Sequence, residues 1–169
     1  MITWVETCHG SKDKAVVQTP LGLLSLQSQG EVLLNADWLV VKDIALQFPA
    51  TSFLQQVVVQ LDGFWQNSRY DFVIKVLKKG TSFRLNVWQA LCQIKAGKVI
   101  TYAELAKVLA TGPRAIGGAC KHNPFPVFVP CHRIISASGI GGYAGAIDGP
   151  LVSIKEGLLA HEKSIPSSL

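Results

Sequence analysis

The segment 123–133 constrains the fold of this chain more than any other, because it contains three prolines within seven residues. Each proline fixes its own φ, lacks a backbone N–H donor and biases the preceding residue towards extended backbone. The segment can therefore form neither a regular helix nor a central β-strand. The residues between the prolines are apolar, so we expect a rigid, mostly buried segment that delivers Cys131 and His132 to one place.

The composition favours a folded protein. Of the 169 residues, 49% are hydrophobic and only 16% are charged, which excludes an intrinsically disordered chain. This length accommodates one large domain or two small ones with a full core. No apolar run is long enough to cross a bilayer, and the first residues lack the pattern of a signal peptide. We therefore expect a cytoplasmic protein without a membrane partner.

The net positive charge of the chain comes entirely from its second half. Residues 1–80 carry seven Lys/Arg and seven Asp/Glu, whereas residues 81–169 carry nine against four, which is the whole net charge of +5. A basic surface of this kind is typical of nucleic-acid binding. An ordinary basic surface without such a partner is the alternative that charge alone leaves open.

The first half of the sequence predicts a sheet with one helix. Short apolar runs at 15–17, 23–26 and 32–34 are separated by turn residues and read as strands. Ser52 and Gln55 have the spacing of a capping box at the start of a helix, and the alternation over 70–77 fits a further strand. A linker at 78–80 then separates two domains, 1–79 and 80–169.

The second half predicts helices. A helix should begin at Thr81 or Ser82 and end near Gly97, and Thr101 and Glu104 form a capping box for the next helix, through Leu109. A tight connection leads to a third helix that starts at Pro113. Two helices joined by a short glycine-containing turn have the outline of a helix-turn-helix, which is weak evidence of DNA binding when taken alone.

One face of the third helix carries unusual residues. Arg114, Gly117, Gly118 and Lys121 lie at i, i+3, i+4 and i+7, so a cation stands at each end of a stripe of bare backbone. Each glycine costs a helix roughly 1 kcal/mol relative to alanine. The face fits close approach to a phosphate backbone or a narrow groove, and close packing of a neighbouring helix explains the glycines equally well.

Cys131 is a candidate nucleophile. A thiol with a pKa of about 8.5 reacts slowly at neutral pH unless a base or cation activates it. Side chains of adjacent residues on extended backbone point apart, so His132 should act on Cys131 through a water molecule. The alternatives are a small core cysteine and a metal site. Nearby ligands for a metal are missing, so we expect none.

Glu162 is a candidate partner of His132. It lies on an apolar stripe of the last helix, where Ile154, Leu158 and Glu162 are spaced as i, i+4 and i+8. An inward carboxylate is costly unless it is paired or hydrogen-bonded, and a histidine is a suitable partner. A solvent-facing position at a frayed helix end is the other interpretation.

The segment Pro130-Cys131-His132-Arg133, with Asn123-Pro124 before it and Gly141-Gly142-Tyr143 after it, resembles the active-site segment of the O6-alkylguanine-DNA alkyltransferases. The resemblance covers nearly all of residues 80–162 and is looser before them. It implies an α+β protein, in which a small RNase H-like sheet-plus-helix domain is followed by a mainly helical, winged-helix-like domain. It also implies a single-use transfer of the alkyl group to Cys131, with no cofactor.

The resemblance also implies a role for each matching residue. Cys131 would accept the alkyl group. His132 would accept the proton of the Cys131 thiol through a water molecule, and Glu162 would orient the imidazole. Tyr102 would donate a proton or hydrogen bond to the leaving guanine, and Asn123 would brace the turn. The expected DNA-binding residues are Arg114, which would replace the extruded base, and Thr101, Ala115, Gly117, Gly118 and Lys121. The expected substrate pocket consists of Ile134, Tyr143, Ala144 and Gly145. In this pocket the backbone around Cys131 and Ile134 would recognise the guanine edge.

The implied partner is double-stranded DNA containing O6-alkylguanine, and O4-alkylthymine is a further expected substrate. We expect a monomer, and assembly of several copies along DNA is left open.

Ala144 stands where some family members have a serine, and the loop 146–153 is longer than usual. The alternatives are a binder of alkylated DNA that transfers nothing, against which Cys131 argues, and a cysteine hydrolase, which would need an oxyanion hole.

Overall fold

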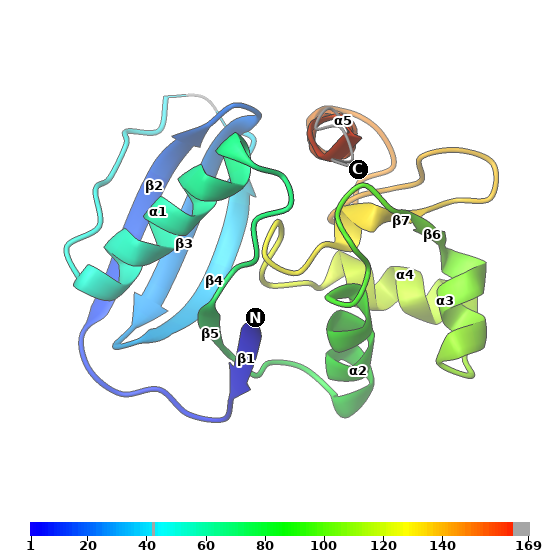
Figure 1. Ribbon diagram of the computed structural model, residues 1–169, viewed down its shortest axis with the longest axis horizontal. Helices are drawn as coiled ribbons and strands as arrows, with labels where there is room; N and C mark the ends of the chain where they lie inside the picture. Colours follow the sequence, from blue (N-terminus) through cyan, green and yellow to red (C-terminus); the bar gives the residue numbers. More distant parts are fainter. Residues whose placement is uncertain (42, 164–169) are drawn as a thin grey trace. The chain divides into compact units, whose positions relative to one another are not determined.

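The computed structural model describes residues 1–41 and 43–163 and divides the chain into two compact units, Met1–Lys79 and Gly80–Leu169. Figure 1 shows that strands predominate in the first unit and helices in the second, so the fold is mixed α+β. Among the described residues, no helix combines the length and apolar character needed to cross a membrane. The four cysteines are free thiols.

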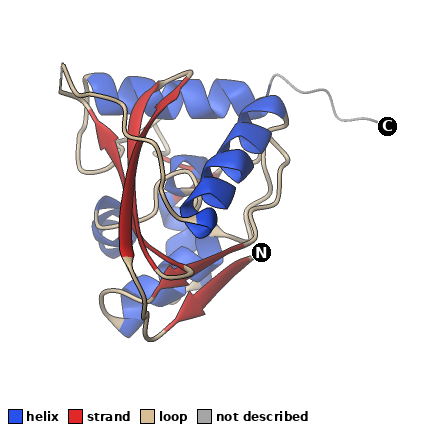
Figure 2. Ribbon diagram, turned by 90° about the vertical axis from the view of Figure 1, so that its left-hand side faces the viewer, coloured by secondary structure: helices blue, strands red, loops and turns tan. Residues whose placement is uncertain are grey.

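The first unit is a twisted sheet covered by one helix. The described strands are β1 (Ile2–Val5), β2 (Lys12–Thr19), β3 (Gly22–Gln29), β4 (Val32–Leu39) and β5 (Ile74–Leu77), in the spatial order β1-β5-β4-β3-β2. Strands β2, β3 and β4 are antiparallel, whereas β5 runs parallel to both β1 and β4. Helix α1 (Ser52–Gln66) lies against one face of the sheet, which Figure 2 shows nearly edge-on.

The helix and the sheet bury one apolar core. Leu54, Leu61 and Phe64 recur at helical spacing on α1 and are fully or almost fully buried, as are Leu24 and Leu26 of β3. This spacing places one side of the helix on the sheet, because residues three, four and seven apart share a face.

Two local predictions for this unit need correction. The N-cap of α1 is Thr51, whose side chain accepts a hydrogen bond from Leu54 N, so Ser52 is the first helical residue rather than the cap. The strand expected over 70–77 is confined to β5, because the backbone of Val73 bonds the side chain of Gln60. A side chain thus replaces a strand partner there.

The second unit is built from short elements. They are α2 (Ser82–Leu91), β6 (Ile100–Thr101), α3 (Tyr102–Val108), α4 (Pro113–Lys121), the 3-10 turn η1 (Cys131–Arg133), β7 (Ile134–Ile135) and α5 (Pro150–Lys163). The expected capping box is present: Thr101 Oγ1 accepts from Glu104 N, and the Glu104 carboxylate accepts from Thr101 N. Pro113 occupies the first turn of α4 as expected.

Helix α2 packs against α4, which in turn packs against α3. Trp88 is fully buried, and its indole N–H donates to the carbonyl of Ala119 over 2.9 Å. Ile116 and Cys120 also lie on the buried side of α4. The opposite side of α4 is consequently turned outward, and the parallel pair β6 and β7 joins the start of α3 to the end of the cysteine turn.

Candidate active site

The proline segment forms a tight, buried loop that ends at Cys131. Val127 has a φ of 75°, which is strained for a β-branched residue and costs on the order of 1–3 kcal/mol. The Val129 amide donates to the Phe125 carbonyl over 2.8 Å, and the Cys131 amide donates to the Val129 carbonyl over 2.8 Å. These contacts hold the strained loop and fix the position of Cys131.

Asn123 spans this loop from its first residue to its last. Its Nδ2 donates to the Val129 carbonyl over 2.8 Å and contacts Cys131 Sγ at 3.1 Å, and its Oδ1 accepts from the Phe125 amide over 3.0 Å. One amide side chain therefore ties the loop ends together and orients the sulfur.

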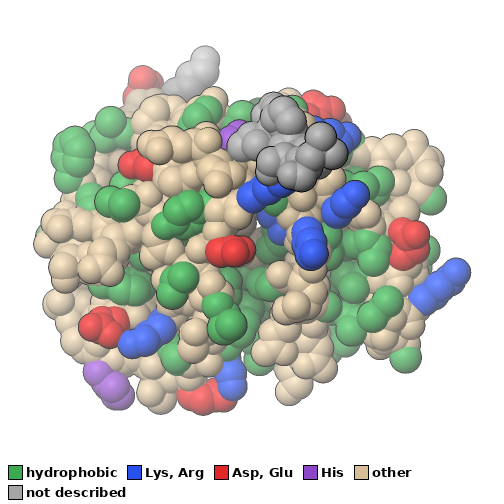
Figure 3. Space-filling model, viewed as in Figure 1, with side chains coloured by type: hydrophobic (Ala, Val, Ile, Leu, Met, Phe, Trp, Pro, Cys, Tyr) green, Lys and Arg blue, Asp and Glu red, His purple; other side chains and the backbone are tan. Residues whose placement is uncertain are grey.

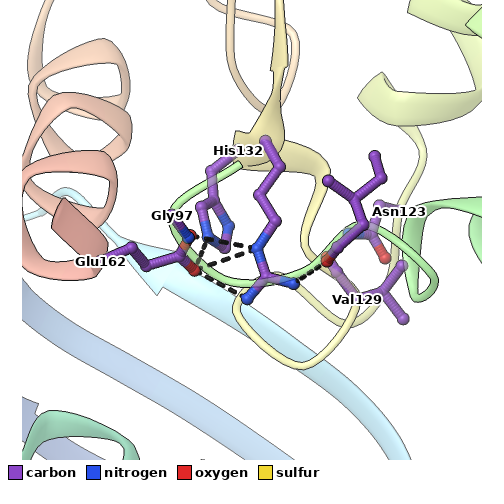
Figure 4. A network of polar contacts seen from close by, with 7 residues as sticks. Gly97, Asn123, Val129, His132 and Glu162 are labelled. Carbon is purple, nitrogen blue, oxygen red and sulfur yellow. Dashed lines mark hydrogen bonds and ion pairs between the residues drawn. The ribbon is translucent and has the colours of Figure 1, made fainter. Parts of the chain in front are cut away.

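His132 and Glu162 form a buried pair behind the cysteine, and Figure 4 shows the two side chains pointing towards each other from the turn and from α5. His132 Nε2 lies 2.7 Å from Glu162 Oε1, and both side chains are fully buried. The carboxylate also accepts from Arg133 and from the Gly97 amide, at 2.8 Å and 3.0 Å. Gly97 is suited to this contact, since its φ is 75° and a Cβ would lie 3.1 Å from the Glu162 carbonyl.

The protonation states of this pair follow from its surroundings. Burial alone would raise the pKa of Glu162, but His132 and Arg133 outweigh it and lower this pKa to about 2. Burial lowers the pKa of His132, in spite of the opposing effect of Glu162, so the imidazole is neutral at pH 7. An ionised carboxylate accepts only, so Nε2 carries the ring proton and Nδ1 is the basic nitrogen.

The basic nitrogen of His132 is available. Nδ1 is buried and has no hydrogen-bond partner among residues 1–41 and 43–163. Burial raises the pKa of the Cys131 thiol to about 11, although the contact with Asn123 and the charge of Lys155 act in the opposite direction. Before the reaction Cys131 is therefore a thiol. The neutral imidazole of the adjacent residue, His132, is a buried base.

Cys131 lies at the wall of a cavity of about 160 Å³. The residues that line it with Cys131 are Tyr102, Gly117, Cys120, Lys121, Gly142, Tyr143, Ala144, Gly145, Ala146 and Ile147. Burial, together with the nearby thiols of Cys120 and Cys131, raises the pKa of the Tyr102 phenol to about 12, so this group is a hydrogen-bond donor at neutral pH. Its hydroxyl points to the Gly142 carbonyl, 3.4 Å away.

The structure thus brings most of the expected pocket together, with one exception. Tyr143, Ala144 and Gly145 line the cavity, whereas Ile134 is fully buried and does not. The Ile134 carbonyl accepts a hydrogen bond from Lys155. Ile134 is therefore part of the supporting backbone, because β7 turns its side chain into the core.

Lys155 is a functional candidate that our sequence analysis missed. It lies on α5 with no exposed surface, and its Nζ donates to the carbonyls of Ile134 and Gly142. The signal was present in the sequence, because Leu151, Lys155, Leu158 and Glu162 are spaced as i, i+4, i+7 and i+11 on one helical stripe. Cys120 and Ile147 were likewise not assigned to the pocket.

The outward face of α4 joins this cavity. Gly117 and Lys121 line it, and Arg114, Ala115, Gly118 and Lys121 are exposed. Leaving aside the nearby backbone of α4 itself, no described heavy atom lies within 4 Å of a Cβ built at Gly118, and at Gly117 the nearest is a Tyr102 ring atom at 4.0 Å. Packing of a neighbouring helix therefore does not explain the two glycines. Figure 3 shows basic side chains over the second unit, interspersed with acidic and hydrophobic ones.

Thr101 caps helix α3. Its hydroxyl takes part in the capping box with Glu104, so its side chain is engaged in holding the start of α3. The expected contact of Thr101 with DNA stays a prediction.

Comparison with known proteins gives consistent matches. The sequence model of a protein family described as "6-O-methylguanine DNA methyltransferase, DNA binding domain" matches residues 82–164. A methylated-DNA–protein-cysteine methyltransferase from Methanosarcina mazei is 35% identical over 145 residues, which are 84% of this chain and 83% of the relative. One from Metallosphaera sedula is 32% identical over 87% of this chain and 90% of the relative.

Solved structures of similar sequence share the fold. The crystal structure of the Mycobacterium tuberculosis O6-methylguanine methyltransferase has a TM-score of 0.77 at 32% identity, over 94% of this chain and 97% of that one. The same bacterial protein in complex with DNA gives 0.75 at 32% identity, over 89% and 93% of the two chains.

Glu162→Gln should destabilise the protein by about 3–5 kcal/mol at pH 7, because it leaves Arg133 and His132 without their buried anion. The pKa of Glu162 is depressed, so its contribution is present above the unfolded pKa, near 4.5, and is lost as the pH falls towards 2. Urea unfolding across this range measures both effects. Glu156→Gln, an exposed change on the same helix, is the control. Equal stabilities of the Glu162→Gln variant and the wild type would contradict the buried pair.

Proposed function

The chain belongs to the methylated-DNA–protein-cysteine methyltransferase family and is a DNA-repair methyltransferase, and we propose that its own Cys131 accepts the alkyl group of O6-alkylguanine in double-stranded DNA. The observation that carries this proposal is the cavity that has Cys131 in its wall, with the His132–Glu162 pair adjoining the cysteine. A nucleophile, a base and an orienting carboxylate are the groups that covalent catalysis by a thiol requires.

Proton removal from the thiol is the first step of the proposed reaction. With a pKa of about 11, Cys131 is almost entirely protonated at neutral pH and needs a base. The Nδ1 atom of His132 takes the proton through a bridging water molecule. Glu162 keeps the proton of Nε2 in place and stabilises the imidazolium that forms, as an ionised carboxylate does for a catalytic histidine.

The thiolate then displaces the purine at the alkyl carbon. The bond from Sγ to carbon forms as the bond from carbon to O6 breaks, and its electron pair passes to the guanine. Tyr102 lines the cavity as a protonated phenol and donates a proton or a hydrogen bond to the purine as negative charge develops there. The product is a thioether that water does not cleave, so each molecule acts once and no cofactor is needed.

The lesion must leave the duplex to reach Cys131. The alkyl carbon is inaccessible in a stacked helix, and extruding one base costs a few kcal/mol. Helix α4 has the features for this, since its exposed face combines bare backbone at Gly117 and Gly118 with Arg114 and Lys121 at its ends. We infer that α4 enters the minor groove, with Arg114 in the place of the extruded base.

The pocket sets the finer substrate choice. Tyr143, Ala144 and Gly145 would face the flipped base, with O4-alkylthymine as a second substrate.

The second unit acts as a winged-helix-like DNA-binding and transfer domain, and the first as an RNase H-like scaffold. We propose a monomer as the active form.

Mass spectrometry of the peptide that holds Cys131 tests the proposed transfer. Incubation with a duplex that contains one O6-methylguanine should add a single methyl group to the peptide that holds Cys131, in one-to-one yield with the repaired base. Cys120→Ala keeps this adduct, whereas Cys131→Ser abolishes it and leaves DNA binding intact. An unmodified Cys131 peptide together with tight binding would instead identify a non-catalytic binder of alkylated DNA.

Arg114→Ala should slow repair of duplex DNA by about 10-fold or more and spare the reaction with free O6-alkylguanine base, because extrusion is needed only in the duplex. Single-turnover rates with the two substrates provide the comparison. Arg84→Ala, a cation of α2, is the control for general loss of charge. Equal slowing with both substrates would exclude the extrusion role of Arg114.

Gly118→Ala should raise the unfolding free energy by about 1 kcal/mol, since alanine favours the helix and a Cβ has open space there. The same change should weaken binding to duplex DNA, because the methyl group blocks close approach of the backbone. Urea unfolding and fluorescence anisotropy report the two effects. Unchanged DNA affinity in the stabilised variant would show that this face is not the docking surface.

A further inference from the structure

We propose that Lys155 is a positioning residue of the transfer reaction, whose buried ammonium group fastens the backbone that follows Cys131 to one wall of the cavity and brings a positive charge to the site. This inference rests on the proposed function for its role in alkyl transfer. It arises from a lysine of α5 that has no exposed surface and that the proton relay of His132 and Glu162 does not use.

Lys155 joins two segments that follow the cysteine. Its Nζ donates to the Ile134 carbonyl over 2.6 Å and to the Gly142 carbonyl over 2.9 Å. Ile134 comes directly after the turn that carries Cys131, and Gly142 lines the cavity and also faces the Tyr102 hydroxyl. The ammonium thus ties the backbone after the cysteine turn to the part of the cavity wall that Gly142 forms.

The charge of Lys155 is poorly compensated. Within the described residues, neither of its hydrogen bonds is to a carboxylate, and Glu162 of the same helix is engaged by His132 and Arg133. An ammonium group held by carbonyl dipoles and an aromatic ring, without an anion, is costly to bury. Lys155 is bonded to Gly142 in the wall of the pocket, and a cost of this kind beside a reactive site indicates a role beyond packing.

The ionisable groups that face Lys155 come from each element around it. Nζ lies 6.0 Å from the centre of the Tyr102 ring of α3, and its charge acts on Cys131 and His132 of the turn and on Cys120 of α4. Of these groups, Tyr102, Cys120 and Cys131 become negative on ionisation, and a cation favours that form. The charge of Lys155 accordingly lowers the pKa of Cys131, against the effect of burial.

The ammonium complements the negative charge throughout the reaction. Charge is first on Sγ as the thiolate forms, and it moves to the guanine when the bond from the alkyl carbon to O6 breaks. Lys155 forms and breaks no covalent bond and keeps its proton, so it stabilises both positions of the charge without entering the chemistry.

The charge state of Lys155 gives the site a particular pH dependence. Burial lowers the pKa of Lys155 to about 8, although the thiols of Cys131 and Cys120 oppose this. The group is charged below that pH and neutral above it. Thiolate formation at Cys131 increases with pH, but above about pH 8 the loss of the cation counteracts it. The reactivity of Cys131 should therefore rise less steeply above pH 8 than below it.

Lys155→Met tests this inference on the full chain. Methionine is of similar length and carries no charge, so the variant should fold, which unfolding curves will verify. The readout is the rate at which iodoacetamide modifies the Cys131 peptide between about pH 6 and pH 10, with methyl transfer from duplex DNA measured in parallel. In the variant we expect the apparent pKa of Cys131 to rise by about one unit or more, with transfer about 10-fold slower at neutral pH. Lys163→Met, an exposed change on the same helix, should alter neither.

The outcomes separate the two proposals. An unchanged Cys131 titration in a folded Lys155→Met protein overturns the role of Lys155, whether or not methyl transfer occurs. A shifted titration without methyl transfer in the wild type supports Lys155 and overturns the proposed function. If the variant does not fold, the pH dependence of Cys131 modification in the wild type is the test. A decrease in the slope of the modification rate near pH 8 supports the inference. A rate that follows one Cys131 titration with no change of slope near pH 8 overturns it.

Discussion

The site depends on one buried carboxylate. Glu162 accepts hydrogen bonds from the side chains of His132 and Arg133 and from the Gly97 amide, and so joins α5, the cysteine turn and the segment after α2. An ionised carboxylate without partners in the interior would cost several kcal/mol. These three segments are therefore held in one arrangement, and the orientation of the His132 ring follows from it.

The second constraint is the strained loop before the cysteine. Its prolines and the left-handed Val127 restrict the backbone, while Asn123 ties its ends and contacts the sulfur. The result is a thiol whose position is set but whose ionisation is disfavoured by burial. Reactivity at Cys131 then depends on groups that act only within the cavity, which makes the sulfur a poor nucleophile towards electrophiles that do not enter it.

Local patterns in the sequence predicted the parts of the fold that local energetics determine. The capping box of Thr101, the start of α4 at Pro113 and the inward position of Glu162 follow from spacing within one helix. The cap of α1 was misplaced by one residue, since Thr51 and Ser52 are equally suitable by type and only the backbone decides between them. The burial of Lys155 was not predicted, because lysine is almost never fully buried and its long side chain ordinarily reaches solvent even from an apolar stripe.

Two kinds of glycine in this chain show what only the structure can separate. Gly97 has a positive φ and little room for a Cβ, so its role is to let the backbone reach Glu162. Gly118 lies in a regular helix with open space around it, where alanine would be the more stable choice. A residue that lowers helix stability without serving any internal contact is explained most simply by an external one. The same reasoning applies to Lys155, whose burial is costly and whose ammonium bonds the backbone after the cysteine turn and Gly142 in the cavity wall. The features that reduce stability thus cluster around Cys131, as expected when a site is organised for reaction rather than for folding.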